Sequence, residues 1–135
     1  MSQVGDGEEG RPQAAGKWIL IVSDQAVMRD ILERFLRTLG HFISTAADGR
    51  EALFKARSLP IDFVLLDLDM GGGLGLASEL RADPALLRLP LLFISARYQA
   101  RELSPRLQGG ATGFLPVPFT LVEVRQLLNA MGGAT

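Results

Sequence analysis

Charged and hydroxyl side chains stand where the most apolar runs of the sequence end. They are Ser23 and Asp24 after the run 18–22, Asp67 after the run 61–66, and Ser95 after the run 90–94. A carboxylate at the rim of an apolar core is costly unless something charged meets it there. The chemistry of this chain therefore depends on what meets Asp67.

Asp24 and Asp67 would face one crevice if the strands before them are neighbours in a sheet. Two carboxylates in one crevice repel each other unless a cation lies between them, and hard oxygen ligands suit Mg²⁺. An aspartate can also attack phosphorus to give an aspartyl-phosphate, and a hydroxyl such as that of Ser95 could then bond a phosphoryl oxygen. Taken singly, each residue is better explained as a helix cap or a solvated strand end. Their combination at three strand ends favours a phosphoryl and metal site.

The elements that must position these residues alternate between apolar runs and amphipathic stretches. Helices are marked by apolar side chains at helical spacing, by a cap at Asp48 and by the stop at Gly40. The pattern predicts strands at 18–22, 41–46, 61–66, 90–94 and 113–115, and helices at 25–39, 48–58, 76–81 and 121–131.

Five strand–helix units with continuously apolar strands predict an α/β fold, a doubly wound parallel sheet covered by helices on both faces. Such sheets place their sites at the carboxyl ends of the strands, where the strand order reverses. The polar residues described above follow the first, third and fourth predicted strands, which is where such a site would form.

Composition excludes several classes of function. The chain has 135 residues, 47% hydrophobic and 21% charged, with a formal net charge of −1 and no cysteine. Neither a nucleic-acid surface nor a thiolate metal site is supported by these values. No apolar stretch is long enough to span a membrane, and the acidic N-terminus does not resemble a signal peptide. We therefore expect a cytoplasmic protein.

The chain is expected to form one domain. Residues 1–16 are rich in glycine and acidic residues and are expected to be a disordered leader, and residues 132–135 a frayed tail. Residues 17–131 between them contain the whole alternating pattern.

The stretches ILIVSD, DGREAL, DFVLLDLDMGGGLG, LLFISAR and GGATGFLPVPF follow one another along the chain. In order and spacing, the region from Trp18 to Met131 resembles the receiver domain of two-component response regulators, of the chemotaxis-regulator type. The resemblance implies a flavodoxin-like (βα)5 fold with strand order 2-1-3-4-5.

The same resemblance implies roles for single residues. Asp67 would accept a phosphoryl group from a histidine kinase or phosphotransfer protein. Mg²⁺ would be held by Asp24, Asp67 and the backbone carbonyl of Asp69. Ser95 would bond the phosphoryl group, and the rotamer of Phe114 would report activation.

The sequence departs from the family pattern at positions that matter for the chemistry. Ser23 stands where the family has the first of two acids, and Val117 stands where it has a lysine. A lysine steadies the phosphoryl group as a point charge, which valine cannot do. We therefore expect weak or atypical phosphorylation and weak Mg²⁺ binding. Arg97 is the nearby candidate for a replacement cation, although a solvated loop charge is its simpler interpretation. The family also commonly has a cis peptide before the proline at 118.

Two other classes of function stay open at this point. One is a protein-interaction module of receiver fold that works without phosphorylation. The other is a phosphatase, because Asp67-Leu68-Asp69 resembles the DxD start of haloacid-dehalogenase-type enzymes. That motif opens the first strand in those enzymes, whereas here it lies on the third, with too few residues after it for the remaining motifs.

Output is expected through contacts, since no effector domain follows Met131 in the sequence. In receivers the fourth helix, fifth strand and fifth helix form the usual partner face, for a downstream effector or for a second receiver in a homodimer. Here Ser104–Pro105 interrupts the fourth-helix region 97–108. Because proline is welcome at a first helical position and serine is a good cap, that helix should start at Ser104 and be very short, with 98–103 irregular.

Overall fold

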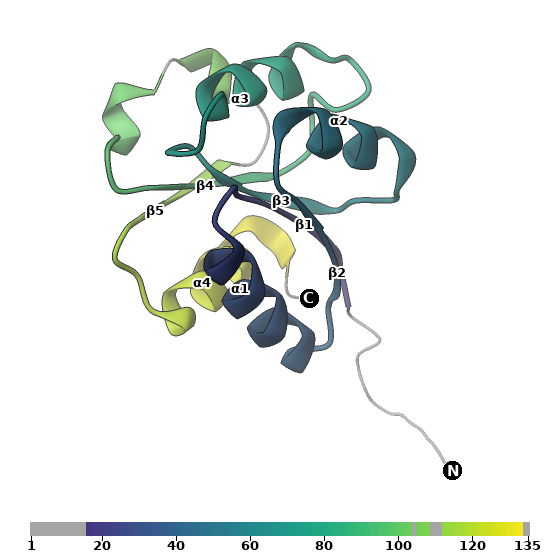
Figure 1. Ribbon diagram of the computed structural model, residues 1–135, viewed down its shortest axis with the longest axis vertical. Helices are drawn as coiled ribbons and strands as arrows, with labels where there is room; N and C mark the ends of the chain where they lie inside the picture. The colour runs from purple at the N-terminus through teal and green to yellow at the C-terminus, as the bar shows by residue number, and fades with distance from the viewer. Residues whose placement is uncertain (1–15, 104, 109–111, 134–135) are drawn as a thin grey trace.

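Five parallel strands form one sheet in the order β2-β1-β3-β4-β5, as the sequence pattern predicts. The structure is a computed structural model that describes residues 16–103, 105–108 and 112–133. Figure 1 shows the sheet running through the middle of the molecule with helices on both sides. The strands are β1 Trp18–Val22, β2 Phe42–Ala46, β3 Phe63–Asp67, β4 Leu91–Ser95 and β5 Thr112–Pro116.

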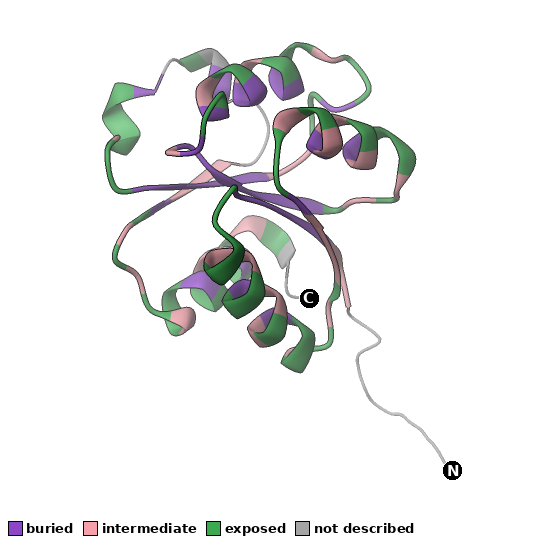
Figure 2. Cartoon of the chain, in the orientation of Figure 1, coloured by how far each residue is buried: buried purple, intermediate pink, exposed green. Residues whose placement is uncertain are grey.

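Burial follows the position of each strand in the sheet. Every residue of β3 and β4 is buried, and all of β1 except its first residue, because these three strands have a neighbour on each side and helices on both faces (Figure 2). The edge strand β2 is buried only at its last residue. Continuously apolar strands are typical of a parallel sheet covered on both faces.

Two helices pack on each face of the sheet. In Figure 1, α1 and α4 lie on one side and α2 and α3 on the other, and the apolar core divides into two clusters accordingly. The helices are α1 Ala26–Thr38, α2 Gly49–Ser58, α3 Gly73–Ala82 and α4 Leu121–Leu128. Thus the label α4 belongs to the helix that occupies the position of the family's fifth helix.

Local chemistry sets where the helices begin and end. Asp48 caps α2 by accepting a hydrogen bond from the Glu51 amide, as predicted. Gly40 follows α1 with a positive φ of 93°, a conformation that favours glycine. The predicted start of α3 at residue 76 was wrong, because the helix already begins at Gly73. A Cβ on Gly73 would lie 2.7 Å from the Leu68 carbonyl oxygen, so this glycine permits a close approach of helix and loop.

The region of the family's fourth helix contains no α-helix among its described residues. Two short 3₁₀ turns, Ala100–Glu102 and Pro105–Gln108, take its place. The second agrees with a short helix after the serine at 104, which itself lies outside the described residues. The expectation of irregular chain over 98–103 was partly wrong, because Gln99 and Glu102 form a reciprocal cap on the first turn.

A buried arginine ties this region to the rest of the fold. Arg81, on the inner face of α3, is 3% exposed. Its guanidinium donates to the carbonyl oxygens of Leu87, Leu89 and Leu107 and to the hydroxyl of Thr112, over 2.7–3.2 Å. One side chain therefore joins the loop before β4, the second 3₁₀ turn and the start of β5.

Several further expectations concern the ends and the loops. The leader 1–16 lies outside the described residues except for Gly16. In the tail 132–135, Gly132 has a positive φ of 90°, so the backbone leaves the helical conformation there, and the last two residues lie outside the description. The Val117–Pro118 peptide is cis, as predicted.

In the described part of the chain, no helix is both long enough and apolar enough to cross a membrane.

Candidate functional site

Asp67 lies at the carboxyl end of β3, in the middle of the sheet. Its neighbours there are the ends of β1 and β4, since Val22 pairs with Leu66 and Asp67 pairs with Ile94. The residue is only 2% exposed. The sheet therefore places a buried carboxylate at the crevice edge that the sequence predicts.

Two neutral hydrogen-bond donors meet the Asp67 carboxylate. The Ser23 hydroxyl donates to Oδ2 over 2.8 Å, and the Asp69 backbone N–H donates to Oδ1 over 2.9 Å. Ser23 is itself fully buried, at 0% exposure. Each oxygen of Asp67 therefore has a hydrogen-bond donor, which offsets part of the cost of burying the carboxylate.

Asp24 follows Ser23 and is exposed at the start of the loop that leads into α1. The strand register explains why Ser23, and not Asp24, contacts Asp67: Ser23 continues β1 beside the last residue of β3. Within 16–103, 105–108 and 112–133, no group of three or more His, Cys, Asp or Glu side chains is arranged to hold a metal ion.

The Asp69 side chain turns toward the end of β4. Its Oδ1 accepts the Ser95 hydroxyl and its Oδ2 accepts the Ala96 backbone N–H, each over 2.6 Å. Burial acts to raise the pKa of the Asp69 carboxyl. The hydrogen bonds from Ser95 and from the backbone of Ala96 and Arg97, together with the Arg97 charge, outweigh burial and hold the pKa below its ordinary value. Asp69 is thus an ionised group bound to the β4 end.

Arg97 contacts the same loop. Its Nη2 donates to the Asp69 backbone carbonyl oxygen over 3.1 Å, and its Nε lies 3.6 Å from Asp69 Oδ1. The Arg97 side chain is 65% exposed, and its guanidinium carbon lies 5.8 Å from the centre of the Tyr98 ring. The residue is therefore more than a solvated loop charge.

The comparisons with known proteins agree with this geometry. Residues 19–129 match the family model of the response regulator receiver domain. The chain belongs to the receiver family.

Relatives with established names are chemotaxis proteins. The chain is 39% identical over 115 residues to the chemotaxis protein CheY of Pseudomonas aeruginosa, covering 82% of this chain and 92% of the relative. It is 37% identical over 115 residues to CheY-3 of Vibrio cholerae, covering 82% and 88%. Among solved structures, the receiver domain of the sensor histidine kinase PA1611 from Pseudomonas aeruginosa superposes with a TM-score of 0.73. It shares 32% identity, with 87% of this chain and 98% of that one covered, and holds a magnesium ion in its active site cleft. This chain is accordingly a receiver domain of CheY type in two-component signalling.

The donor types at this receiver's site fit a magnesium ion. Hard oxygens suit Mg²⁺, and oxygens of this kind are present at the exposed Asp24 carboxylate, the buried Asp67 carboxylate and the Asp69 backbone carbonyl. The lack of a cluster of three acidic side chains among the described residues does not argue against such a site, because a backbone carbonyl can take the place of the third side chain. The Asp69 carbonyl oxygen accepts a hydrogen bond from Arg97 in this structure.

A second arginine near the site was not anticipated from the sequence. Arg29 Nη1 donates to the Ser23 backbone carbonyl oxygen over 2.7 Å. Arg97 is therefore one of two arginines beside the crevice, rather than the single candidate cation that the sequence suggested. Arg29 follows Ser23 by six residues, in the helix after β1, and this spacing was the available signal.

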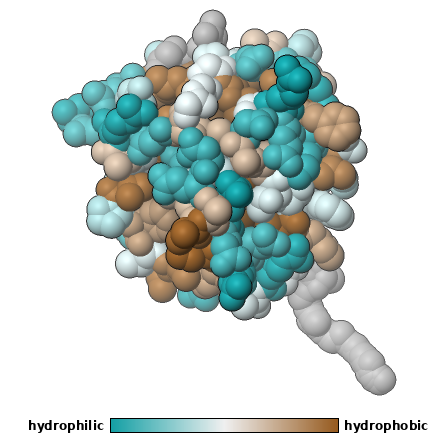
Figure 3. Space-filling model, viewed as in Figure 1, coloured by the Kyte–Doolittle hydropathy of each residue, from teal (hydrophilic) through white to brown (hydrophobic). Residues whose placement is uncertain are grey.

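An apolar residue, Val117, occupies the position where the family has a lysine. Val117 packs against the α1–α4 core cluster, and its amide donates to the Ser95 carbonyl oxygen over 2.9 Å. With Met28 and Phe119 among others, it lines an apolar groove beside α1. Figure 3 shows apolar side chains gathered over the start of α1 on a largely polar face. Phe114, the predicted switch aromatic, is half-buried against the opposite cluster, on the side of α2 and α3.

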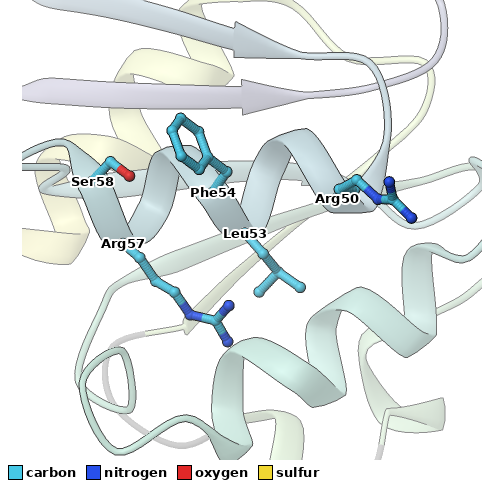
Figure 4. A pocket seen from close by; sticks show the side chains of 5 residues that line it. All are labelled: Arg50, Leu53, Phe54, Arg57 and Ser58. Atoms are coloured by element: carbon cyan, nitrogen blue, oxygen red, sulfur yellow. The ribbon is translucent and has the colours of Figure 1, made fainter.

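Another groove lies on α2, away from the carboxylates. Leu53 and Arg57 project from α2 to the same side of the helix (Figure 4). Arg57 Nε contacts Asp83 Oδ2 over 2.9 Å at the end of α3. This ion pair bridges α2 and the end of α3.

Proposed function

We propose that this CheY-type receiver accepts a phosphoryl group on Asp67, slowly and with weak binding of Mg²⁺. The phosphodonor is a histidine kinase or a phosphotransfer protein. The observation that carries the proposal is the position of Asp67 at the carboxyl end of the central strand, where Ser23 donates to it over 2.8 Å and Ser95 ends the neighbouring strand. Five strands in receiver order bring these residues to one edge.

The reaction moves one phosphoryl group between two nucleophiles. An Asp67 carboxylate oxygen attacks the phosphorus of a phosphohistidine, an O–P bond forms, and the P–N bond breaks with its electron pair going to the imidazole. The chain's own donors then surround the new acyl phosphate. The Ser95 hydroxyl is the donor from β4, once it leaves Asp69.

A divalent cation would supply charge neutralisation when bound. Asp24, Asp67 and the Asp69 carbonyl are the residues that would hold it. Asp24 is exposed and can turn toward the crevice, whereas Asp67 is fixed by Ser23 and by the Asp69 amide.

Three features support slow phosphorylation. Val117 brings no positive charge to the phosphoryl group, and packs on the apolar core instead. Asp67 is 2% exposed and both its oxygens accept hydrogen bonds, which reduces their availability as nucleophiles. The Ser95 hydroxyl is engaged with Asp69 at 2.6 Å.

Intact-mass measurement after incubation with acetyl phosphate and MgCl₂ tests this proposal. We expect slow labelling of the wild type and none of Asp67→Asn. Restoring the family residues together, as Ser23→Asp with Val117→Lys, should raise the labelling rate at least about tenfold, since a positioned cation on a phosphoryl group is worth more than about 1.4 kcal/mol. Equal labelling of wild type and double variant would refute the assignment of Val117 as the limiting residue.

A phosphorylation-independent interaction module is the second candidate function. The burial of Asp67 and the hydrogen bond from Ser95 to Asp69 favour this function, because these polar groups already have partners within the protein and need no ligand. In either case the effector would bind the face formed by 97–108, β5 and α4, which would also serve a homodimer. Failure of wild type and double variant alike to label Asp67 would select this second function.

A further inference from the structure

The contact of Arg97 with Asp69 points to a role that the family assignment does not supply. Its guanidinium donates to the Asp69 carbonyl oxygen over 3.1 Å, and this is the oxygen that the proposed function gives to Mg²⁺. The same guanidinium lies 3.6 Å from the Asp69 carboxylate. A cation of the protein thus already contacts the metal's backbone ligand.

We propose that Arg97 is a built-in competitor of the divalent cation, so that Mg²⁺ binds this receiver only as Arg97 leaves the Asp69 carbonyl. The inference rests on the proposed function, because it takes the metal ligands from it. It adds a named residue that sets the affinity of the site for Mg²⁺.

Electrostatics makes the two cations mutually exclusive at this oxygen. A carbonyl oxygen has lone pairs for two partners, so geometry alone permits both. A guanidinium and a Mg²⁺ ion on one oxygen would lie within a few ångströms of each other, and like charges at that distance repel strongly even in a wet crevice. Binding of the divalent ion therefore requires the arginine to move.

The arginine is able to move, because its side chain is 65% exposed. Contacts of exposed ionic groups are weak, so displacement costs little and Arg97 lowers the affinity without abolishing it. The Arg97 amide stays bound to Ser95 Oγ at 3.0 Å, so the backbone keeps the side chain within reach. When Mg²⁺ is removed, the guanidinium can return.

The arrangement also joins the two loops in the resting state. The Asp69 carboxylate accepts hydrogen bonds from Ser95 and Ala96, and the Asp69 carbonyl accepts one from Arg97. These three hydrogen bonds join the β3–α3 loop to the end of β4 and the residues that follow it. In this state the Ser95 hydroxyl donates to Asp69 and not to a phosphoryl oxygen. The competition thus couples metal entry to the release of the contacts around Asp69.

The test is a titration of the ¹⁵N-labelled full chain with MgCl₂ at fixed ionic strength, followed at the amides of residues 23, 67 and 96. We expect Arg97→Gln to bind Mg²⁺ about fivefold more tightly than wild type, which is the upper end of what an exposed ionic contact is worth. Arg97→Lys keeps the charge but not the forked donor and should lie between them.

Arg101→Gln is the matched control. It removes the same charge from an exposed arginine in the neighbouring 3₁₀ turn and should leave the affinity within about twofold of wild type. Equal affinities in wild type, Arg97→Gln and Arg101→Gln, or weaker binding in Arg97→Gln, would overturn the competition and leave the proposed function standing. Saturable shifts that persist in Asp67→Asn, or no saturable binding in any variant, would overturn the metal site of the proposed function and the competition with it.

Discussion

Arg81 offers the sharpest test of how this receiver holds the region of the family's fourth helix, whose described residues form two short 3₁₀ turns. Its guanidinium is buried on α3 and donates to the carbonyls of Leu87, Leu89 and Leu107 and to the Thr112 hydroxyl. Replacing Arg81 by methionine keeps a long stem for packing and removes every donor. We expect the second 3₁₀ turn, Pro105–Gln108, to loosen first, because Leu107 loses its partner on α3.

The magnitude follows from the acceptors that are left behind. A buried acceptor without its donor costs about 1–3 kcal/mol, and water entering the gap relieves part of the total. Arg81→Met leaves neutral acceptors and no unpaired charge, so the cost is that of the lost hydrogen bonds, and we expect a total of about 2–4 kcal/mol. Burial lowers the pKa of the Arg81 guanidinium, but an arginine stays charged, so the network is present at every ordinary pH. With a total stability of about 5–15 kcal/mol for a domain, such a loss is a large fraction.

Urea unfolding followed by far-UV circular dichroism measures the change. Arg57→Met is the control, because Arg57 makes an exposed ion pair with Asp83 and its loss should cost only about 0.2–1 kcal/mol. Amide exchange at Leu107 should accelerate in Arg81→Met and not in Arg57→Met. A loss below about 1 kcal/mol in Arg81→Met, or a loss equal to that of the control, would refute the reasoning.

Two further predictions concern glycine and histidine positions. Gly73→Ala should destabilise the chain by about 1–3 kcal/mol, because the added Cβ would lie 2.7 Å from the Leu68 carbonyl oxygen. Gly75→Ala should instead stabilise α3 by about 0.5–1 kcal/mol, because its Cβ would have no atom within 4 Å and alanine favours the helix. Thermal unfolding of the two variants measures these changes, and a change of the same sign in both variants would contradict the prediction. His41 Nδ1 accepts the Lys17 amide at 3.1 Å, and burial, then the Lys17 charge, lowers the pKa of His41 below 6.5. Its contribution to stability should therefore be complete above pH 6.5 and be lost as the pH falls from there through the folded pKa. In urea unfolding measured over this pH range, His41→Gln should remove the loss of stability that the titration of His41 causes. The same pH profile in wild type and variant would refute this role of His41.

The fold could be predicted from the sequence because a parallel sheet leaves a strong pattern. Strands such as β1 are apolar from end to end, and helices such as α1 show one apolar face. Element ends were less predictable. The start of α3 was missed because Gly72 and Gly73 resemble a loop in sequence, whereas the close approach of Gly73 to the Leu68 carbonyl becomes visible only when the chain is folded.

The site could be predicted in its residue types and its place, but not in its hydrogen bonds. Asp67 and Ser95 follow from the strand ends, since parallel strands meet at one edge. The turn of Asp69 toward Ser95 could not be predicted, because its donors lie at the end of β4 and just after it, 26 and 27 residues further along the chain. Arg81 left a signal that was not used: it continues the buried stripe of α3 formed by Leu76, Ala77 and Leu80.

The two departures from the family pattern are explained together by the contacts of Asp67. An acid at position 23 would lie against the buried Asp67 carboxylate, and the repulsion would need the family's lysine, or a metal, to offset it. Ser23 instead donates to Asp67 Oδ2 at 2.8 Å and removes that need. Position 117 is then free to carry an apolar side chain, and Val117 packs on the α1–α4 cluster. Restoring the acid alone should therefore destabilise the chain, and restoring it with the lysine should recover the loss, because the two positions act on the same carboxylate.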